Sequence, residues 1–367
     1  MQRISATYRV RARAADIDAT ARALALEQSV ELPLEAISDP YVRDHVVGVV
    51  QSIAPHSEEL FDVVVGLSVA TTGFDVAQTM NMLFGNSSLH PHIELIDVEF
   101  PAAFLGRFAG PRFGIQGLRE LLHAPQRPLT CSALKPQGLP SAELAALCYT
   151  FAAGGIDVIK DDHGLADQSY APFAERVAAC QRALERARRE CGTRALYAPS
   201  LVGSPRTLAE QARIIRAEGV GMVLLAPALL GIPAFAELVH EHIEVPVLAH
   251  PAYAGAARVS PPLLLGKLFR LLGADAVIYP NFGGRFSYSA ERCRELAGAA
   301  RAPWGEIRPA LPVPAGGMTV ERAAELVEFY GNDVMLLIGG SLLAAGDALP
   351  ARTREFTAAV SAARRRA

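Results

Sequence analysis

From about residue 119 onward, short runs of β-forming residues alternate with amphipathic helical runs eight times. The strand candidates are nearly continuous apolar runs, which is typical of parallel strands covered on both faces. They are residues 129–134, 156–160, 195–201, 222–226, 245–250, 274–279, 310–314 and 334–338. The helical runs that follow them are residues 141–153, 172–190, 205–218, 233–242, 261–272, 289–300, 319–330 and 351–365. Eight consecutive βα units form a closed barrel or a doubly wound sheet, and the count of eight favours an α/β fold with a (β/α)₈ TIM barrel over residues 119–367.

Residues 1–118 follow a different pattern. Strands are expected at 4–10, 43–53, 60–70 and 92–98, and helices at 16–28 and 75–84. This βαββαβ order predicts an N-terminal α+β domain of the ferredoxin-like type. Residues 99–128, which contain several Pro and Gly, would link this domain to the barrel.

Composition excludes some classes of partner. Hydrophobic residues make up 51% of the chain, charged residues 20%, and the net charge is −3. We therefore expect no attraction to nucleic acid or to an anionic membrane. No apolar run reaches the roughly 18 residues of a membrane span, and the chain leads into its first strand without a signal segment. The five scattered cysteines lack CxxC spacing and fit a reducing cytoplasm.

In such barrels the reactive groups stand at the carboxyl ends of the strands. The richest loop there is Lys160-Asp161-Asp162-His163, after the second strand. Its carboxylates and imidazole suit Mg²⁺ or a transition metal, and a salt-bridged strand end is the alternative. Side chains alternate along a strand, so the alternation must break at the strand end if Asp162 and His163 are both ligands.

Other strand ends carry further candidates. Lys135 follows the first strand and is either a desolvated general acid or base or a surface lysine. His250 ends the fifth strand and is either a proton shuttle or a core histidine. The pairs Gly316-Gly317 and Gly339-Gly340 follow the last two strands. They would let backbone N–H groups approach a phosphate, and tight turns are the alternative.

Several segments, in order along most of the chain, resemble the large subunit of ribulose-bisphosphate carboxylase, and in particular its divergent RuBisCO-like (form IV) proteins. Residues 108–115, FAGPRFGI, resemble the family's FxGPxxGI linker, and Leu134-Lys135-Pro136 resembles its IKPK motif. Residues 154–162, GGIDVIKDD, resemble GGxDxxKDDE. The two glycine pairs resemble the SGG and GGG phosphate loops of that family.

The resemblance implies roles for these residues. Lys160 would be carbamylated by CO₂ and would bind Mg²⁺ together with Asp162 and with His163, which stands where the family has glutamate. Lys135 would transfer protons, His250 matches the histidine after the fifth strand, and Gly316, Gly317, Gly339 and Gly340 would bind phosphate. The family's active sites lie between two subunits, so a homodimer or a multiple of dimers is implied. Glu27 and Asn86 match the contexts of the residues that the partner supplies.

The sequence also departs from the family pattern. The second lysine of the KPK motif is Gln137, and the phosphate-binding arginine after the fifth strand is Pro251. The mobile-loop lysine is replaced by Arg285 or its neighbours, and the serine of SGG is Ala315. These losses remove groups that bind the bisphosphate or handle CO₂, which argues against carbon fixation. Losing phosphate ligands on one side only predicts a monophosphate substrate.

The sequence thus predicts a Mg²⁺-dependent lyase or isomerase that enolises a phosphorylated keto sugar or keto acid. The resemblance implies one of the reactions of RuBisCO-like proteins, and because the 280–286 loop and His163 look unlike those of the salvage enolase, we favour 3-oxo-isoapionate 4-phosphate decarboxylation, or transcarboxylation with hydrolysis, in apiose breakdown. The alternatives are the methionine-salvage reactions, namely 2,3-diketo-5-methylthiopentyl-1-phosphate enolase and methylthioribulose-phosphate isomerase. A non-catalytic sugar-phosphate-binding protein and a metal-free aldolase are rivals of other classes.

Overall fold

The computed structural model describes residues 2–286 and 288–363, and two of the residues in the last predicted helix, 364 and 365, lie outside that range. Contacts between residues divide the chain into two units. The first unit contains residues 1–108 and 255–264, and the second contains residues 109–254 and 265–367. The boundary predicted at 118/119 falls within helix α4 (Gly114–Leu121), which packs with the second unit.

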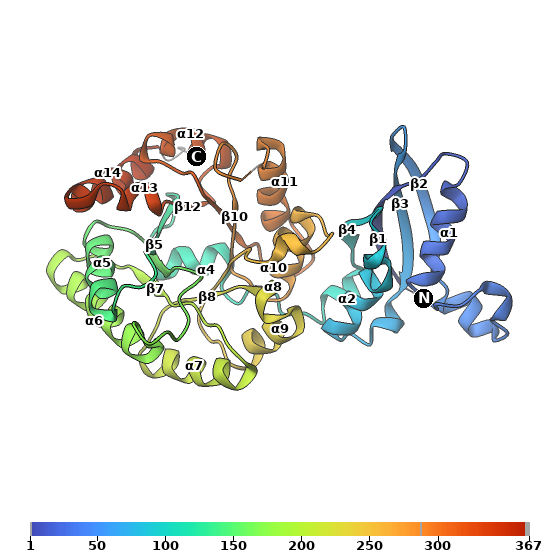
Figure 1. The fold of residues 1–367 in the computed structure, drawn as a ribbon, viewed down its shortest axis with the longest axis horizontal. Coiled ribbons are helices and arrows are strands. Elements are labelled where there is room, and N and C mark those ends of the chain that lie inside the picture. Colours follow the sequence, from blue (N-terminus) through green and yellow to red (C-terminus); the bar gives the residue numbers. More distant parts are fainter. Residues whose placement is uncertain (1, 287, 364–367) are drawn as a thin grey trace. The chain divides into compact units, whose positions relative to one another are not determined.

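The first unit is an antiparallel sheet with two main helices, as the βαββαβ pattern predicts (Figure 1). Its strands lie in the order β2-β3-β1-β4, which is a ferredoxin-like arrangement. Alternating residues of β1 are buried because they face the helices. The helices and strands are β1 (Arg3–Arg11), α1 (Ile17–Glu27), η1 (Leu34–Ala36), η2 (Val42–Val46), β2 (Val49–Ser57), β3 (Leu60–Ser68), η3 (Val69–Thr72), α2 (Val76–Phe84), η4 (Asn86–Leu89), β4 (Ile93–Glu99) and α3 (Ala102–Leu105).

The predicted strand 43–53 is only half correct. Residues Val42–Val46 form a π-helical turn, and β2 begins later, at Val49. The Asp39 carboxylate accepts hydrogen bonds from the N–H groups of Tyr41 (2.7 Å) and Val42 (3.2 Å), which starts a helical turn in place of the strand.

The second unit contains the eight predicted parallel strands, ringed by helices (Figure 1). Two four-stranded sheets, β12-β5-β6-β7 and β11-β10-β9-β8, contact each other at both edges and close the barrel. The strands are β5 (Leu129–Leu134), β6 (Val158–Asp161), β7 (Leu196–Ala198), β8 (Val223–Leu225), β9 (Val247–Ala249), β10 (Ala276–Pro280), β11 (Leu311–Ala315) and β12 (Met335–Leu337).

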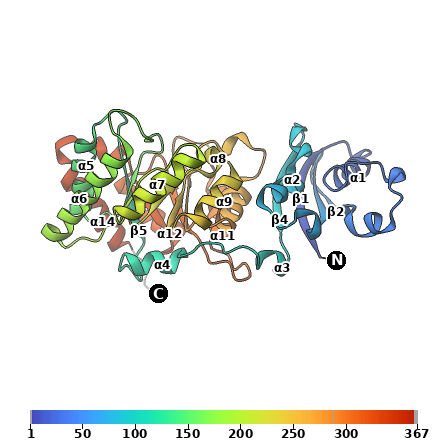
Figure 2. The same cartoon turned by 90° about the horizontal axis from the view of Figure 1, so that it is seen from below.

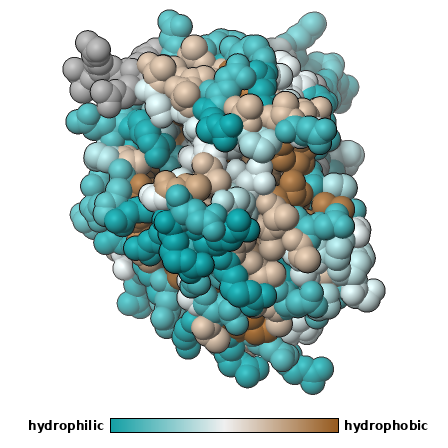
Figure 3. All heavy atoms as spheres, turned by 90° about the vertical axis from the view of Figure 1, so that its left-hand side faces the viewer, coloured by the Kyte–Doolittle hydropathy of each residue, from teal (hydrophilic) through white to brown (hydrophobic). Residues whose placement is uncertain are grey.

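Helices follow the strands where the sequence predicts them, and they are amphipathic. Figure 3 shows hydrophilic side chains over most of the face that it presents, with hydrophobic side chains in separate areas. Within the described ranges, none of the helices has the length and hydropathy that a membrane crossing requires. The remaining helices are α5 (Ser141–Ala153), α6 (Phe173–Cys191), α7 (Pro205–Ala217), α8 (Pro227–Leu230), α9 (Ile232–Glu241), η5 (Ala254–Ala256), η6 (Pro262–Leu268), α10 (Phe269–Leu271), α11 (Ala290–Arg301), η7 (Val320–Arg322), α12 (Ala323–Tyr330), α13 (Gly340–Leu343), η8 (Gly346–Ala348) and α14 (Leu349–Ala362).

Helix α4 closes the amino-terminal end of the barrel (Figure 2). Its residues Ile115 and Leu118 join the core made by the inward-facing strand residues. Arg119 of the same helix donates to the carbonyls of Ala124 and Asn332, which precede β5 and β12. The opposite end of the barrel, where the strands finish, is therefore the end open to a substrate.

Candidate active site

Lys160 is a buried charged residue at the carboxyl end of β6. The lysine is only 3% exposed, and its Nζ donates a 2.9 Å hydrogen bond to the Asp161 carbonyl oxygen. Burial lowers the pKa of Lys160, because the charged ammonium has lost its water. A lowered pKa makes the neutral amine of a lysine easier to reach, and this is the form that reacts with CO₂ and other electrophiles.

Four side chains from three strand ends form a continuous group around Asp162. The Lys135 Nζ after β5 lies 2.5 Å from Asp162 Oδ2, and the His163 Nδ1 lies 3.3 Å from Asp162 Oδ1. The His163 ring stacks on the His250 ring beyond β9, with centroids 4.2 Å apart and planes 13° from parallel. The structure thus brings together Lys135, Asp162, His163 and His250, with Lys160 from the same strand end as Asp162.

The charges in this group influence one another. Burial opposes ionisation of Asp162, but hydrogen bonds from Lys135 and the Gly164 N–H outweigh it and lower the Asp162 pKa to about 2. Burial, with the nearby lysines, lowers the pKa of His163, and the Asp162 carboxylate opposes this shift. At neutral pH, Asp162 is therefore ionised and His163 is biased toward its neutral, metal-ligating form.

His250 is held as one neutral tautomer. Burial and the positive charge of Lys160 lower its pKa to about 2. Its Nδ1 accepts a 3.1 Å hydrogen bond from the Ala252 N–H, so the ring proton of the neutral form lies on Nε2. This arrangement leaves His250 a hydrogen-bond donor at Nε2.

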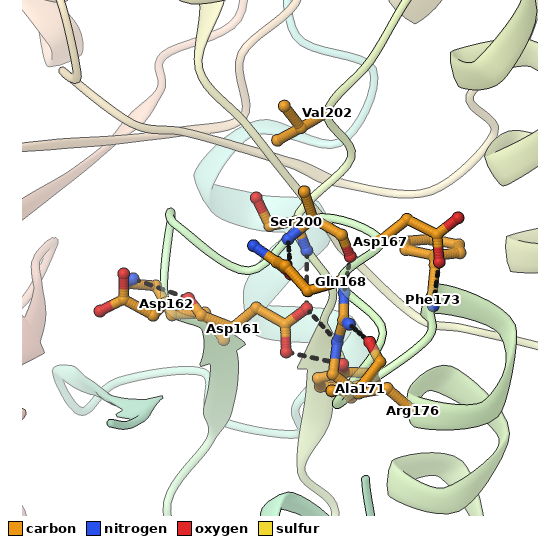
Figure 4. A network of polar contacts seen from close by, with 12 residues as sticks. Asp161, Asp162, Asp167, Gln168, Ala171, Phe173, Arg176, Ser200 and Val202 are labelled. Carbon is orange, nitrogen blue, oxygen red and sulfur yellow. Dashed lines mark hydrogen bonds and ion pairs between the residues drawn. The ribbon is translucent and has the colours of Figure 1, made fainter. Parts of the chain in front are cut away.

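The side chain of Asp161 points away from that of Asp162 and toward Arg176, as Figure 4 shows. Its carboxylate accepts hydrogen bonds from Arg176 Nε (3.1 Å), the Tyr197 hydroxyl (2.7 Å) and the Ser200 N–H (3.1 Å). Strand β6 ends at Asp161. The His163 side chain contacts the Asp162 carboxylate and does not point in the direction of the Asp161 side chain, as strand alternation would require. Asp162 and His163 thus contact each other just after the strand end, and their role as metal ligands stays a prediction. Sequence reasoning missed Arg176 because a fully buried arginine on a helix resembles a solvated one in a linear sequence.

The glycine loops after β10 and β11 pack against each other. Gly316 and Gly317 have positive φ angles of 83° and 69°, which favour glycine. A Cβ on Gly317 would lie 2.5 Å from the Gly284 Cα, and a Cβ on Gly284 would overlap the Gly316 carbonyl oxygen. Loop packing alone therefore requires glycine at Gly284 and Gly317, and phosphate binding remains a prediction there. Gly284 was not among the predicted site residues.

Beyond β12, Gly339 and Gly340 have open space where a Cβ would stand, apart from ordinary contact with Ala133. Arg285, in the β10–α11 loop, is exposed, and its guanidinium lies 5.0 Å from the centre of the Phe286 ring. The Arg285 charge is among the smaller influences that lower the pKa of His163.

Glu27 and Asn86 are brought together within the first unit. Asn86 Nδ2 donates a 3.0 Å hydrogen bond to Glu27 Oε1, although 59 residues separate them. Glu27 ends α1, and Asn86 begins the η4 turn after α2. Their side chains form one polar pair on the ferredoxin-like unit.

A divalent cation at this site would need oxygen or nitrogen ligands from the side chains at the strand ends. Among the described residues, no cluster of three His, Cys, Asp or Glu side chains is arranged to hold a metal ion. Asp162 and His163 supply one carboxylate and one imidazole, and Lys160 would add an oxygen ligand only as a carbamate. Lys135 forms an ion pair with Asp162, so this carboxylate already holds a positively charged group at the place where a metal ion would bind. The set fits Mg²⁺ once Lys160 is carbamylated.

A barrel with lysines, a carboxylate and histidines at its strand ends defines an enzyme of the TIM-barrel class. Residues 114–362 match the family described as "Ribulose bisphosphate carboxylase large chain, catalytic domain". The chain therefore belongs to this family, among its non-carboxylating RuBisCO-like (form IV) proteins.

Three relatives and one solved structure show where it lies in the family. The chain is 53% identical to ribulose bisphosphate carboxylase-like protein 1 of Rhodopseudomonas palustris and 50% identical to 5-methylthioribulose-1-phosphate isomerase of Rhodospirillum rubrum, over 98% of this chain in both cases and 98% and 97% of the relatives. It is 34% identical to 2,3-diketo-5-methylthiopentyl-1-phosphate enolase of Geobacillus thermodenitrificans, over 93% of this chain and 87% of the relative. A crystal structure of a Rubisco-like protein from Rhodopseudomonas palustris matches all of both chains with a TM-score of 0.93 and 47% identity.

Proposed function

We propose that this chain is an isomerase of a phosphorylated, methylthio-substituted pentulose, acting on 5-methylthioribulose 1-phosphate or a close analogue. The observation that carries the proposal is the continuous group of Lys135, Asp162, His163 and His250 at the strand ends. The group contains a lysine that would transfer the proton and, linked to it through Asp162 and His163, a histidine that would donate a hydrogen bond. The 50% identity with an enzyme named for this isomerisation, over nearly all of both chains, supports the choice of substrate.

The isomerisation needs a proton to leave one carbon beside the carbonyl and another to reach the neighbouring carbon. Lys135 Nζ would take and return the proton. The His250 Nε2–H would donate a hydrogen bond to the oxygen of the enediol intermediate. Atoms balance, because the proton removed from one carbon is restored to the neighbouring carbon and the hydroxyl proton passes to the former carbonyl oxygen, so that the carbonyl and hydroxyl exchange places. No CO₂ is gained or lost.

The substrate's phosphate would be held by backbone N–H groups of the Gly316-Gly317 and Gly339-Gly340 loops. The open space beside Gly339 and Gly340 supports this role. Pro251 and Gln137 offer no positive charge for a second phosphate. A monophosphate therefore fits this end of the barrel better than a bisphosphate.

Asp162, His163 and a carbamate on Lys160 would hold Mg²⁺, which when bound would polarise the substrate carbonyl. The lowered pKa of Lys160 supports carbamylation, because the neutral amine is the reactive form. Lys135 would leave Asp162 when the cation binds, and its neutral amine would then take the proton from the substrate carbon.

We further propose a homodimer, or a multiple of dimers, in which Glu27 and Asn86 complete the partner's site. Their mutual hydrogen bond supports this, because it presents a carboxylate and an amide together on one small unit. Arg285 would approach the substrate from the β10–α11 loop as a further cation.

The test is turnover of 5-methylthioribulose 1-phosphate by the purified chain with Mg²⁺ and bicarbonate. Proton and phosphorus NMR in D₂O should show an isomeric phosphate that carries deuterium beside the carbonyl. EDTA should stop the reaction, and Lys135→Met should slow it about 10²- to 10⁴-fold while leaving the fold intact. Absence of turnover with Mg²⁺ and bicarbonate would overturn the proposal.

The same assay separates the other candidates. The enolase reaction is the second candidate, since the Geobacillus thermodenitrificans relative carries that name, and it predicts turnover of the diketo-methylthiopentyl phosphate. The apiose-type reaction stays a prediction that none of the relatives named above shares, and it predicts CO₂ release from 3-oxo-isoapionate 4-phosphate. A non-catalytic binding protein would retain phosphate esters without converting any of them.

A further inference from the structure

Arg176, on the first turn of α6 (Phe173–Cys191), is fully buried and lies outside the group described above. Its guanidinium donates to Asp161 Oδ2 (3.1 Å), the Ala171 carbonyl (2.6 Å) and the Ala166 carbonyl (2.8 Å), as Figure 4 shows. One side chain thus ties the end of β6 to two points in the loop that leads from β6 to α6.

A chain of hydrogen bonds continues from Arg176 to the Asp162 carboxylate. Arg176 holds the Ala166 carbonyl, and the Ala166 N–H donates to Gln168 Oε1 (2.8 Å). Gln168 Nε2 donates to the Gly164 carbonyl (2.7 Å), and the Gly164 N–H donates to Asp162 Oδ1 (2.9 Å). Arg176 therefore reaches Asp162 both through the β6 backbone and through this loop.

The Arg176–Asp161 pair is poorly explained by stability alone. Both side chains are completely buried, and such pairs often contribute no more stability than apolar residues of the same shape. Burial raises the pKa of Asp161, and Arg176, Tyr197 and the Ser200 N–H oppose that shift. The geometry is better explained if Arg176 holds the end of β6 and the β6–α6 loop in position, because a planar guanidinium fixes three acceptors at once.

We propose that Arg176 is the positioning residue of this active site: through Asp161 and the β6–α6 loop it sets where Asp162, His163 and Lys160 stand. The inference rests on the proposed function for its metal role. Arg176 does not touch the substrate or the cation. It acts as an outer support of the kind that fixes the orientation of metal ligands.

The test is Arg176→Lys, which keeps the charge beside Asp161 but cannot fix three acceptors. We expect the variant to fold, with the Mg²⁺ concentration for half-maximal activity raised about tenfold and kcat lowered about tenfold. KM for the phosphorylated substrate should change less than twofold, because the phosphate loops follow β11 and β12. The control is Arg186→Lys on the same helix, whose exposed side chain pairs with Glu190 and which should change none of these values.

Two further readouts do not depend on turnover. Mn²⁺ binding in the presence of bicarbonate, followed by the loss of the free-ion EPR signal, should weaken about tenfold in Arg176→Lys. Hydrogen exchange at the Gly164 and Ala166 amides should become faster in that variant. If the wild type turns over none of the candidates, the proposed function fails, and these two readouts still decide the role of Arg176.

A second variant guards against misfolding. Arg176→Met with Asp161→Asn removes both charges and should fold even where Arg176→Lys does not. It should show the same faster exchange and weaker Mn²⁺ binding. Wild-type Mn²⁺ affinity and exchange rates in whichever of these variants folds would overturn the proposal.

Discussion

The buried ionisable side chains at the two ends of the barrel differ in their hydrogen bonding and in the direction of their pKa shifts. At the amino-terminal end, Asp157 accepts hydrogen bonds from both terminal nitrogens of Arg127, and Asp275 accepts from three backbone N–H groups. At the carboxyl-terminal end, Lys160 has one backbone acceptor and a lowered pKa, and His250 has a pKa of about 2. Asp157 and Asp275 at the first end each accept several hydrogen bonds within the fold, whereas at the second end burial lowers the pKa values of Lys160 and His250.

This difference indicates which buried residues contribute mainly to stability and which contribute mainly to function. A buried aspartate with all its acceptor sites used holds strands together and has little left to offer a ligand. A buried lysine with one partner costs stability and gains reactivity. Substitutions at the two ends should therefore separate activity from the free energy of unfolding.

The largest effect is expected from Lys160→Met. Removing the amine would remove the proposed carbamate ligand, so kcat should fall about 10³-fold or more. The free energy of unfolding should rise by about 1 kcal/mol, because a poorly solvated charge is replaced by an apolar chain of similar length. Steady-state kinetics and urea unfolding measure the two quantities. Full activity in this variant would contradict both the metal assignment and the contrast between the ends.

Asp157→Ala should have the opposite effect: it should lower stability and leave activity nearly unchanged. The substitution leaves the Thr130 N–H without its acceptor and Arg127 without its carboxylate partner, and the free energy of unfolding should fall by about 3 kcal/mol. The kcat of the folded fraction should stay within twofold of wild type. Asp333→Ala is the matched control, since Asp333 is half exposed and its partner Arg119 keeps three carbonyl acceptors. Its loss should stay below about 1 kcal/mol.

Gly284→Ala tests the contact between the loops after β10 and β11. The added methyl would overlap the Gly316 carbonyl oxygen, so the two loops must separate. We expect KM for the phosphorylated substrate to rise about tenfold, equivalent to about 1.4 kcal/mol, with stability changed little. Gly298→Ala in α11 is the control, because a Cβ there meets nothing within 4 Å. An unchanged KM would show that the loop contact has no part in substrate binding.

The smallest effect concerns pH at the amino-terminal end. Burial raises the pKa of Asp275, and the N–H groups of Gly114, Val247 and Phe113 oppose the shift. A raised carboxyl pKa contributes stability below the unfolded value of about 3.9, and this contribution is lost as pH rises through the folded value. Asp275→Asn cannot titrate. The wild type minus variant difference in unfolding free energy should therefore fall as pH rises above 4, and a rising difference would contradict this account.

Much of the fold follows from local pattern. Eight apolar runs with helices between them leave few arrangements other than a barrel, and β5 and α5 match the predicted ranges residue for residue. The exceptions have local causes that periodicity does not register. The turn at Val42–Val46 depends on one capping carboxylate, and the place of α4 depends on Arg119 and Asp275, whose partners are far along the chain.

The candidate site was only partly readable from the sequence. Lys135, Lys160, Asp162, His163 and His250 stand at strand ends, and strand ends are predictable. Their grouping was not, because the 4.2 Å stacking of His163 on His250 depends on barrel closure. The direction of the Asp161 side chain could not be predicted either. Two adjacent aspartates look equivalent in a sequence, and only the structure shows that Arg176 and Tyr197 bind the carboxylate of Asp161.

The sequence by itself determined the class of fold, the order of its elements and the chemical groups at the open end, because each depends on local propensity and on counting strands. Only the tertiary structure decided which of those groups meet, which are buried without full solvation, and which aspartate supports the site rather than lining it. Those properties depend on contacts between residues distant in the chain and on the loss of water around them, and neither is encoded in any short segment.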